Sequence, residues 1–262
     1  MSTAVKKATS APRFEAGEEY ELKKVVAFAA HPDDLDFGAA GTVARLTQAG
    51  IHVEYCLVTN GDAGGFDEKH RPDIERMRQD EQRAAAARVG VSEVHFLGER
   101  DGYVAPTLEL QKKIVALLRK VRPEMVIAHH PERTWSNMQS QHPDHLSVGE
   151  AVVRAVYPAL ENPFAFPELQ AEGLEAYRLR ELWLFGGPEE RENHFVDVSG
   201  VRELKREALL AHLSQHPDPE RMMNFVEEKL ARVAQRGGLP EGALSEAFHA
   251  VTVNGKQTIS GF

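Results

Sequence analysis

Short apolar runs alternate with amphipathic helical patterns along most of this 262-residue chain, and this alternation is its most constraining feature. Five apolar runs have the length and β-branched content of buried strands, at 24–30, 51–59, 93–97, 125–128 and 181–185. Helical patterns follow the first four of these runs, at 41–48, 74–89, 108–120 and 146–157. Strands that alternate with helices form parallel sheets covered on both sides. The sequence therefore predicts an α/β fold, a Rossmann-like, mostly parallel sheet with helices on both faces.

Beyond the last expected strand, the chain predicts further helices. The patterns at 201–213 and 221–235 are helical, whereas the stretch that begins at Gly237 contains glycine and proline and is expected to be mostly irregular. We therefore expect a C-terminal helical segment and extension at 201–262, added to the sheet.

The hydrophobic content is that of one globular domain. With 42% hydrophobic residues, the chain has enough apolar side chains for a sizeable core. Residues 1–20 are polar and show no usable period, so we expect a mobile N-terminal tail. The remaining residues, 21–262, are expected to form a single domain with its core at 24–200.

Charge and cysteine content limit what the chain binds and where it works. The chain carries 31 Lys and Arg against 40 Asp and Glu, a net charge of −9, which argues against nucleic-acid binding because phosphate backbones are held by excess positive charge. No run approaches the roughly 20 apolar residues that cross a bilayer, so no membrane span is expected. The single Cys56 cannot form an internal disulfide, so we expect a buried structural thiol in a cytoplasmic protein.

Two loops that follow expected strands carry most of the candidate metal ligands. HPDD at 31–34 directly follows the first expected strand, and HPDH at 142–145 lies between the fourth expected strand and the next helix. Ligands of parallel sheets bind beyond the carboxyl ends of the strands, so we expect the two loops to lie together. Imidazole and carboxylate groups suit Zn²⁺ or another divalent ion, and a catalytic zinc takes three protein ligands. The two loops supply these and leave groups for a base and an oxyanion-stabilising donor.

Several of these residues also have ordinary structural interpretations. His-Pro-Asp is a common turn sequence, so either loop alone is as consistent with a turn as with a site. A third copy at 216–218 lacks a following His or Asp, and we expect a helix-terminating turn there. His129 and His130, which follow the fourth expected strand, are either substrate contacts or histidines with structural partners. Trp135 either stacks on a sugar face or anchors its loop.

Five motifs occur in a characteristic order between about Lys24 and Gly149. They are AHPDDLDFGAAGT, VTNGDAGG, a helix with Arg78-x-x-Glu81, LGERDG and the late HPDH. Together they resemble the PIG-L/LmbE-like family of zinc-dependent N-deacetylases, although Leu35 stands where the family often has Glu. The resemblance implies hydrolysis of the acetyl–nitrogen bond of an N-acetylated amino sugar or glycoconjugate by a metal-activated hydroxide. The implied cofactor is Zn²⁺, with Fe²⁺ or another divalent ion an alternative in the cell.

The resemblance also implies a role for each polar residue of the two loops. The implied metal ligands are His31, Asp34 and His145. Asp33, beside them, would be the general base that takes a proton from water. His142 would stabilise the oxyanion or protonate the leaving amine. Asp144 would orient or charge-balance a histidine of the second loop, as carboxylates around metal ligands do.

Four further residues are candidate substrate contacts. Asp62, Arg78 and Asp101 match family positions near the sugar pocket, but they are also consistent with a turn former, a helix salt bridge and a second turn. His130 is a candidate because it follows a strand end. We expect the partner to be a small N-acetylated sugar conjugate, and self-association into a homo-oligomer stays open.

Three other functions fit parts of the pattern. An amidase that cleaves a thiol-conjugated pseudodisaccharide would use the same machinery. A metallo-β-lactamase-like hydrolase is disfavoured because Ser140 occupies the first histidine position of that motif and the strand pattern differs. A non-catalytic sugar-binding α/β module would have little use for Asp33 and His142 beside the ligands.

Overall fold

The computed structural model describes residues 21–135, 138 and 141–255. The mobile tail expected at 1–20 therefore lies outside the described residues, as does part of the loop before the second motif. Within the described residues, no helix has the length and apolar character needed to cross a membrane.

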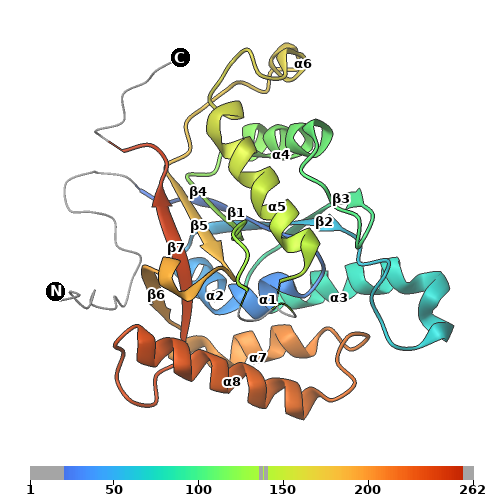
Figure 1. The fold of residues 1–262 in the computed structure, drawn as a ribbon, viewed down its shortest axis with the longest axis vertical. Coiled ribbons are helices and arrows are strands. Elements are labelled where there is room, and N and C mark those ends of the chain that lie inside the picture. Colours follow the sequence, from blue (N-terminus) through green and yellow to red (C-terminus); the bar gives the residue numbers. More distant parts are fainter. Residues whose placement is uncertain (1–20, 136–137, 139–140, 256–262) are drawn as a thin grey trace.

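A seven-stranded sheet, in the order β3-β2-β1-β4-β5-β7-β6 over the described residues, forms the centre of the molecule (Figure 1). Five neighbouring strands run parallel: β1 Lys24–Ala29, β2 His52–Thr59, β3 Glu93–Glu99, β4 Met125–His129 and β5 Glu181–Phe185. In the register, Val25 of β1 lies opposite Val53 on one side and Met125 on the other. This is the expected mostly parallel α/β sheet.

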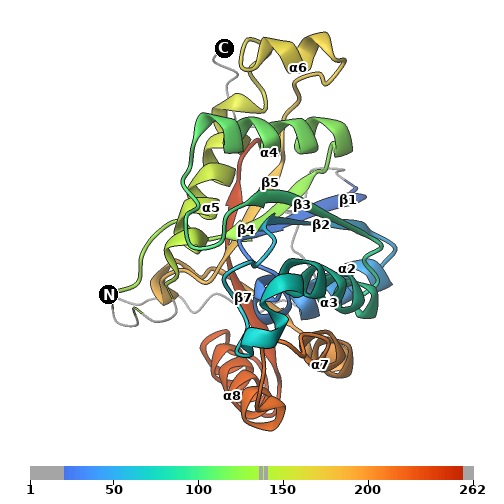
Figure 2. The ribbon, with the colours of Figure 1, turned by 90° about the vertical axis from the view of Figure 1, so that its right-hand side faces the viewer.

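Helices cover both faces of the sheet (Figure 2). One face carries α1 Asp34–Gly38, α2 Ala40–Gln48, α3 Ile74–Arg88, α7 Arg202–Leu210 and α8 Pro219–Arg236. The other carries α4 Leu108–Val121, α5 Pro143–Arg154 and α6 Pro167–Ala171. Short helical turns connect these elements: η1 Glu68–Asp73, η3 Ala155–Ala159, η4 Glu189–Arg191 and η5 Ser199–Val201.

The strands separate two hydrophobic cores. In β1, Val25 and Ala27 belong to the core under α2 and α3, while Val26 and Phe28 belong to the core under α4 and α5. Successive side chains of a strand point to opposite faces, so a strand covered on both sides must be apolar throughout. This explains the uninterrupted apolar runs in the sequence.

The end of the chain differs from its expected irregular form. Residues Ser245–Thr252 form β7, which lies antiparallel between β5 and β6, His194–Asp197. The prediction of an irregular stretch was wrong here because β7 carries a buried charge, Glu246, that breaks the apolar signature of a strand. The Glu246 carboxylate accepts the amide protons of Gly41 and Thr42 at 2.9 and 2.7 Å and pairs with Lys205 at 2.7 Å.

The third His-Pro-Asp copy was also assigned the wrong role. Instead of ending a helix, Asp218 caps the start of α8, and its carboxylate accepts the amide proton of Arg221 at 3.0 Å. An aspartate three residues before such an amide is a typical N-cap, so the pattern was open to this interpretation.

Candidate metal centre

The first motif leaves the carboxyl end of β1 and enters the short helix α1. Asp33 adopts φ 99°, in the left-handed region that is costly for a residue with a side chain. The Gln82 carboxamide accepts the Asp33 amide proton at 2.8 Å and so holds this conformation. The Asp34 carboxylate accepts the His31 amide proton at 2.8 Å. The turn therefore presents His31, Asp33 and Asp34 from one short segment.

The second motif forms the first turn of α5, three residues earlier than the helix expected at 146–157. Pro143 occupies the first helical turn, where its missing N–H costs nothing. The imidazole of His142 caps the helix, because its Nδ1 accepts the Asp144 amide proton at 3.2 Å. Asp144 and His145 therefore project from a helix start rather than from a loop.

The three implied metal ligands lie together, because both histidines contact the Asp34 carboxylate. Nε2 of His145 lies 3.0 Å from Oδ1 of Asp34, and Nδ1 of His31 lies 3.3 Å from Oδ2. One ring nitrogen each of His31, His142 and His145 also lie within 4.8 Å of one another. Ligands at 2.0–2.2 Å from one tetrahedral ion are roughly 3.3 Å apart. The nitrogen and oxygen donors thus fit a single divalent ion.

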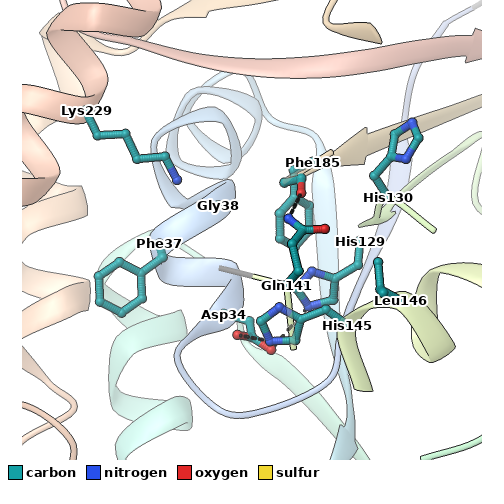
Figure 3. A pocket seen from close by; sticks show the side chains of 11 residues that line it. Asp34, Phe37, Gly38, His129, His130, Gln141, His145, Leu146, Phe185 and Lys229 are labelled. Atoms are coloured by element: carbon teal, nitrogen blue, oxygen red, sulfur yellow. Dashed lines mark hydrogen bonds and ion pairs between the residues drawn. The ribbon is translucent and has the colours of Figure 1, made fainter. Parts of the chain in front are cut away.

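His129 joins this cluster from the end of β4. Its Nε2 lies 3.2 Å from Oδ2 of Asp34, and its ring stacks on His145 with centroids 4.1 Å apart (Figure 3). Burial and the charge of His145 lower the pKa of His129 to about 4. Burial alone would raise the pKa of Asp34, but His145 and His129 outweigh it and hold that pKa well below its usual range. A neutral His129 beside an ionised Asp34 suits a metal-binding cluster.

Asp33 stands next to this cluster with a different environment. Burial and repulsion by Asp34 raise the pKa of Asp33 to about 6, while Arg78 opposes the shift. A guanidinium nitrogen of the buried Arg78 lies 3.6 Å from Oδ2 of Asp33, and another lies 3.7 Å from Oδ2 of Asp101. Arg78 therefore sits between two carboxylates of the site.

The carboxylate of Asp144 contacts a histidine of the first loop, whereas its backbone amide bonds to His142 of the second. Its Oδ2 lies 3.2 Å from Nε2 of His31, and its two oxygens accept the amide protons of Gly102 and Val104 at 2.7 and 3.2 Å. Oδ1 of Asp101 lies 3.1 Å from the same His31 nitrogen. Burial lowers the pKa of His31, but Asp101, Asp144 and Asp34 together outweigh it and raise that pKa to about 12. The direct histidine contact of the carboxylate therefore differs from the expected one, because the start of α5 turns it toward His31 and Gly102. Burial lowers the pKa of His142, and the charge of Asp144 nevertheless opposes that shift, as expected of a charge-balancing residue.

The remaining two candidate substrate contacts, Asp62 and His130, bond to residues outside the ligand cluster. The Asp62 carboxylate accepts the Asp101 amide proton at 2.9 Å, so it joins two loops. The ring of His130 points away from His129 (Figure 3), toward His249 at 3.0 Å. The Nδ1 of His130 accepts the Glu132 amide proton at 3.0 Å. His130 still lines the pocket, but structural partners occupy both ring nitrogens.

The comparisons with known proteins agree with this arrangement. The sequence profile described as PIG-L, GlcNAc-PI de-N-acetylase, matches residues 26–156. A diacetylchitobiose deacetylase of Thermococcus kodakarensis is 34% identical over 78% of this chain and 75% of its own. The chain belongs to the PIG-L family. The resemblance that the motifs indicated is thereby confirmed.

Two further relatives of this PIG-L protein carry related names. A probable N-acetyl-alpha-D-glucosaminyl L-malate deacetylase 2 of Bacillus cereus is 32% identical over 71% of this chain and 80% of its own. The structure of N,N'-diacetylchitobiose deacetylase from Pyrococcus horikoshii superposes with a TM-score of 0.81 and 27% identity, covering 88% of this chain and 85% of that one. The metallo-β-lactamase-like alternative is set aside by this family assignment.

Three residues of this PIG-L protein's site escaped the sequence analysis. His129 had been left open between two interpretations, and only its contact with Asp34 distinguishes it from His130. Gln82 lies four residues after Arg78, on the same face of α3, and that spacing was a usable signal. Lys229 lines the pocket together with Asp34 and His145, but it comes from α8, far along the chain (Figure 3). Nothing in its local sequence distinguishes it.

Proposed function

We propose that this PIG-L protein is a metal-dependent N-deacetylase that removes the acetyl group from the nitrogen of an N-acetylated amino sugar or glycoconjugate. The observation that carries the proposal is the convergence of His31, Asp34 and His145 beside the separate carboxylate of Asp33. Relatives are named as deacetylases of diacetylchitobiose, of N-acetyl-alpha-D-glucosaminyl L-malate and of an inositol glycoside with a 2-acetamido group. Their common feature is an acetylated amino sugar.

We assign the metal to His31, Asp34 and His145, with His129 positioning Asp34 through its Nε2 contact at 3.2 Å. A divalent ion bound there would polarise the amide carbonyl and acidify water. Two imidazoles and one carboxylate suit Zn²⁺, and the same donors also accept Fe²⁺. Zn²⁺ is the proposed cofactor.

Asp33 is the proposed general base. Gln82 fixes its backbone, and Arg78, which approaches its carboxylate at 3.6 Å, keeps its side chain beside the ligand cluster. In this role Asp33 accepts a proton from the attacking water. Loss of that proton makes the water oxygen nucleophilic at neutral pH, so that it can attack the acetyl carbon and form the tetrahedral species.

His142 is the proposed oxyanion stabiliser and proton donor. Because its Nδ1 accepts the Asp144 amide proton, the neutral ring carries its own proton on Nε2. The rings of His142 and His31 meet edge to face with centroids 4.8 Å apart, so His142 lies at the rim of the cluster. From this place Nε2–H can donate to the developing oxyanion and then to the leaving amine.

Asp144 and Asp101 are proposed to act through His31. Both carboxylates accept from Nε2 of His31, which orients the ring and leaves Nδ1 directed at the cluster. A carboxylate on a ligating histidine fixes its tautomer and raises its basicity. Arg78 and Asp62 hold the adjoining loops, and with Asp101 they are proposed to form the wall that meets the sugar.

A substrate panel on metal-loaded protein tests this function. Diacetylchitobiose, an N-acetylglucosaminyl malate and an N-acetylglucosaminyl inositol would be assayed for free amine and acetate, with and without a chelator. We expect equal release of both products that chelator abolishes and zinc restores. The amidase alternative predicts cleavage of a thiol-conjugated pseudodisaccharide without acetate. A sugar-binding module predicts binding without either product.

We also propose that the protein works in the cytoplasm. The support is its single cysteine, Cys56, which the fold buries as a free thiol. Burial raises the pKa of the Cys56 thiol well above its usual range, so the thiol stays protonated and unreactive.

A further inference from the structure

A lysine from the C-terminal helix enters the pocket of the candidate metal centre. Lys229 of α8 lines this pocket together with Asp34, Phe37 and His145. Figure 3 shows its side chain reaching from α8 toward Gly38, on the side of the pocket opposite His130. Part of the side chain is exposed to solvent, so a ligand that enters the pocket can reach the ammonium group.

Lys229 differs from the other polar side chains of the pocket because it has no hydrogen-bond or ion-pair partner among the described residues. His129 contacts Asp34, and His130 bonds to His249. The Gln141 side chain accepts from the Thr134 amide and donates to the Gly186 carbonyl. Lys229 makes neither a hydrogen bond nor an ion pair with any residue that the structure describes.

The two carboxylates that act on Lys229 electrostatically, Glu192 and Glu246, are already engaged with other residues. Glu246 binds the ammonium of Lys205 at 2.7 Å and two backbone amides of α2. Glu192 pairs with Arg236. Burial, and to a smaller extent repulsion by Lys205, lower the pKa of Lys229, while Glu192 and Glu246 oppose the shift. An anion bound beside the ammonium group would favour its charged form and oppose the effect of burial.

We propose that Lys229 is a specificity-determining residue that binds an anionic group of the substrate, a carboxylate or a phosphate attached to the N-acetylated amino sugar. The inference rests on the proposed function, because the pocket that holds Lys229 also holds Asp34 and His145. A single molecule that places its acetamide at the metal ligands therefore has a second point of recognition at Lys229. A hydrogen bond between charged groups is worth about 1.5–3 kcal/mol, or roughly 10- to 150-fold in binding.

Matched substrates isolate the contribution of this charge. The set is an N-acetylglucosaminide of a hydroxy acid, its neutral methyl ester, and the corresponding phosphate with its neutral triester. The proteins are wild type, Lys229→Met, Lys229→Arg and Arg232→Met. The last is a matched control. Arg232 is a cationic residue of the same helix, its side chain is 60% exposed, and its guanidinium makes a long contact of 3.9 Å with the Glu228 carboxylate.

We expect wild type to favour an anionic member over its neutral partner at least about tenfold in kcat/KM, mainly through KM. Lys229→Met should bring this ratio close to one, while Lys229→Arg and Arg232→Met should keep it. Comparison of the carboxylate and phosphate pairs identifies the anion. A ratio near one in wild type, or an equal ratio in wild type and Lys229→Met, would overturn the inference.

Calorimetric titration of the same pairs separates this inference from the proposed function. If metal-loaded wild type hydrolyses none of the substrates, the deacetylase assignment fails, yet the binding ratios still test Lys229. Tighter binding of the anion that Lys229→Met removes would support the lysine as an anion-recognition residue. Equal binding of charged and neutral members would contradict it whether or not turnover occurs.

Discussion

The Nε2 atom of His31 lies 3.2 Å from Oδ2 of Asp144, although 113 residues separate the two in the chain. His31 follows β1, and Asp144 lies in the first turn of α5, so their contact ties the two motifs together. The same carboxylate accepts the amide proton of Gly102, the last residue of LGERDG, and that of Val104 just beyond it. One side chain therefore connects three of the family's motifs.

Asp144→Asn should weaken metal binding. The amide retains one oxygen for the backbone donors but removes the negative charge that His31 faces. We expect about a 10- to 100-fold loss of metal affinity, the usual effect of changing a carboxylate behind a ligating histidine. Competition with a chromogenic chelator measures it. Unchanged affinity would mean that Asp144 only supports the loop.

Asp33→Asn should remove turnover while the metal stays bound. A carboxamide cannot accept the proton of the attacking water, and loss of a general base costs about 10²- to 10⁴-fold in kcat. Elemental analysis supplies the control, since zinc content should equal that of wild type. A variant with normal kcat would exclude Asp33 as the base.

His145→Ala should lower the metal content of the purified protein. The change removes one of the three proposed ligands and the contact of its Nε2 with Asp34 at 3.0 Å. We expect well below half of the wild-type zinc after dialysis, whereas His130→Ala should leave zinc unchanged, because the partners of His130 lie outside the cluster. Equal zinc in wild type and His145→Ala would refute the ligand assignment.

His194 should make the fold sensitive to acid. Burial against Trp183 lowers the pKa of His194 to about 4 in the folded protein, below about 6.5 in the unfolded chain. Between pH 6.5 and 4 the unfolded chain therefore binds a proton that the folded protein does not. The free energy of unfolding consequently falls as the pH falls through this window, and is unaffected by His194 above it.

His194→Gln should abolish this part of the acid sensitivity. We expect the loss of stability between pH 7 and 4.5 to be about 1–2 kcal/mol smaller than in wild type, measured by urea unfolding at each pH. His70→Gln, in the partly exposed turn η1, is the control and should keep the wild-type slope. Identical slopes for wild type and His194→Gln would contradict the assignment.

Glu246→Ala should destabilise the whole domain. It leaves the buried Lys205 ammonium with only the carbonyls of Asp36 and Phe37 and no carboxylate, and two amides of α2 without an acceptor. Breaking a buried charge pair costs about 3–5 kcal/mol. Calorimetry should show a large drop in Tm, whereas Glu203→Ala on the exposed side of α7 should change it little. A loss below about 1 kcal/mol would mean that β7 is held by its strand pairing alone.

Local sequence patterns were sufficient to predict the five parallel strands and the placement of the two motifs. Apolar periodicity is a local property: Val25 and Val26 reveal a strand covered on both faces because each must be buried in a different core. The rule that parallel sheets bind ligands at strand ends then placed the HPDD loop next to the HPDH turn. Both inferences need only neighbouring residues and a general property of the fold.

Which side chains contact each other depends on how distant segments pack, and the sequence did not reveal it. His129 and His130 are adjacent in sequence, yet one contacts Asp34 and the other His249. Strand β7 contains a buried charge whose partner, Lys205, lies 41 residues earlier. The entry of Lys229 into the pocket likewise depends on how α8 packs against the sheet. A buried polar group is stabilised by partners distant in sequence, so local patterns show its presence but not its partner.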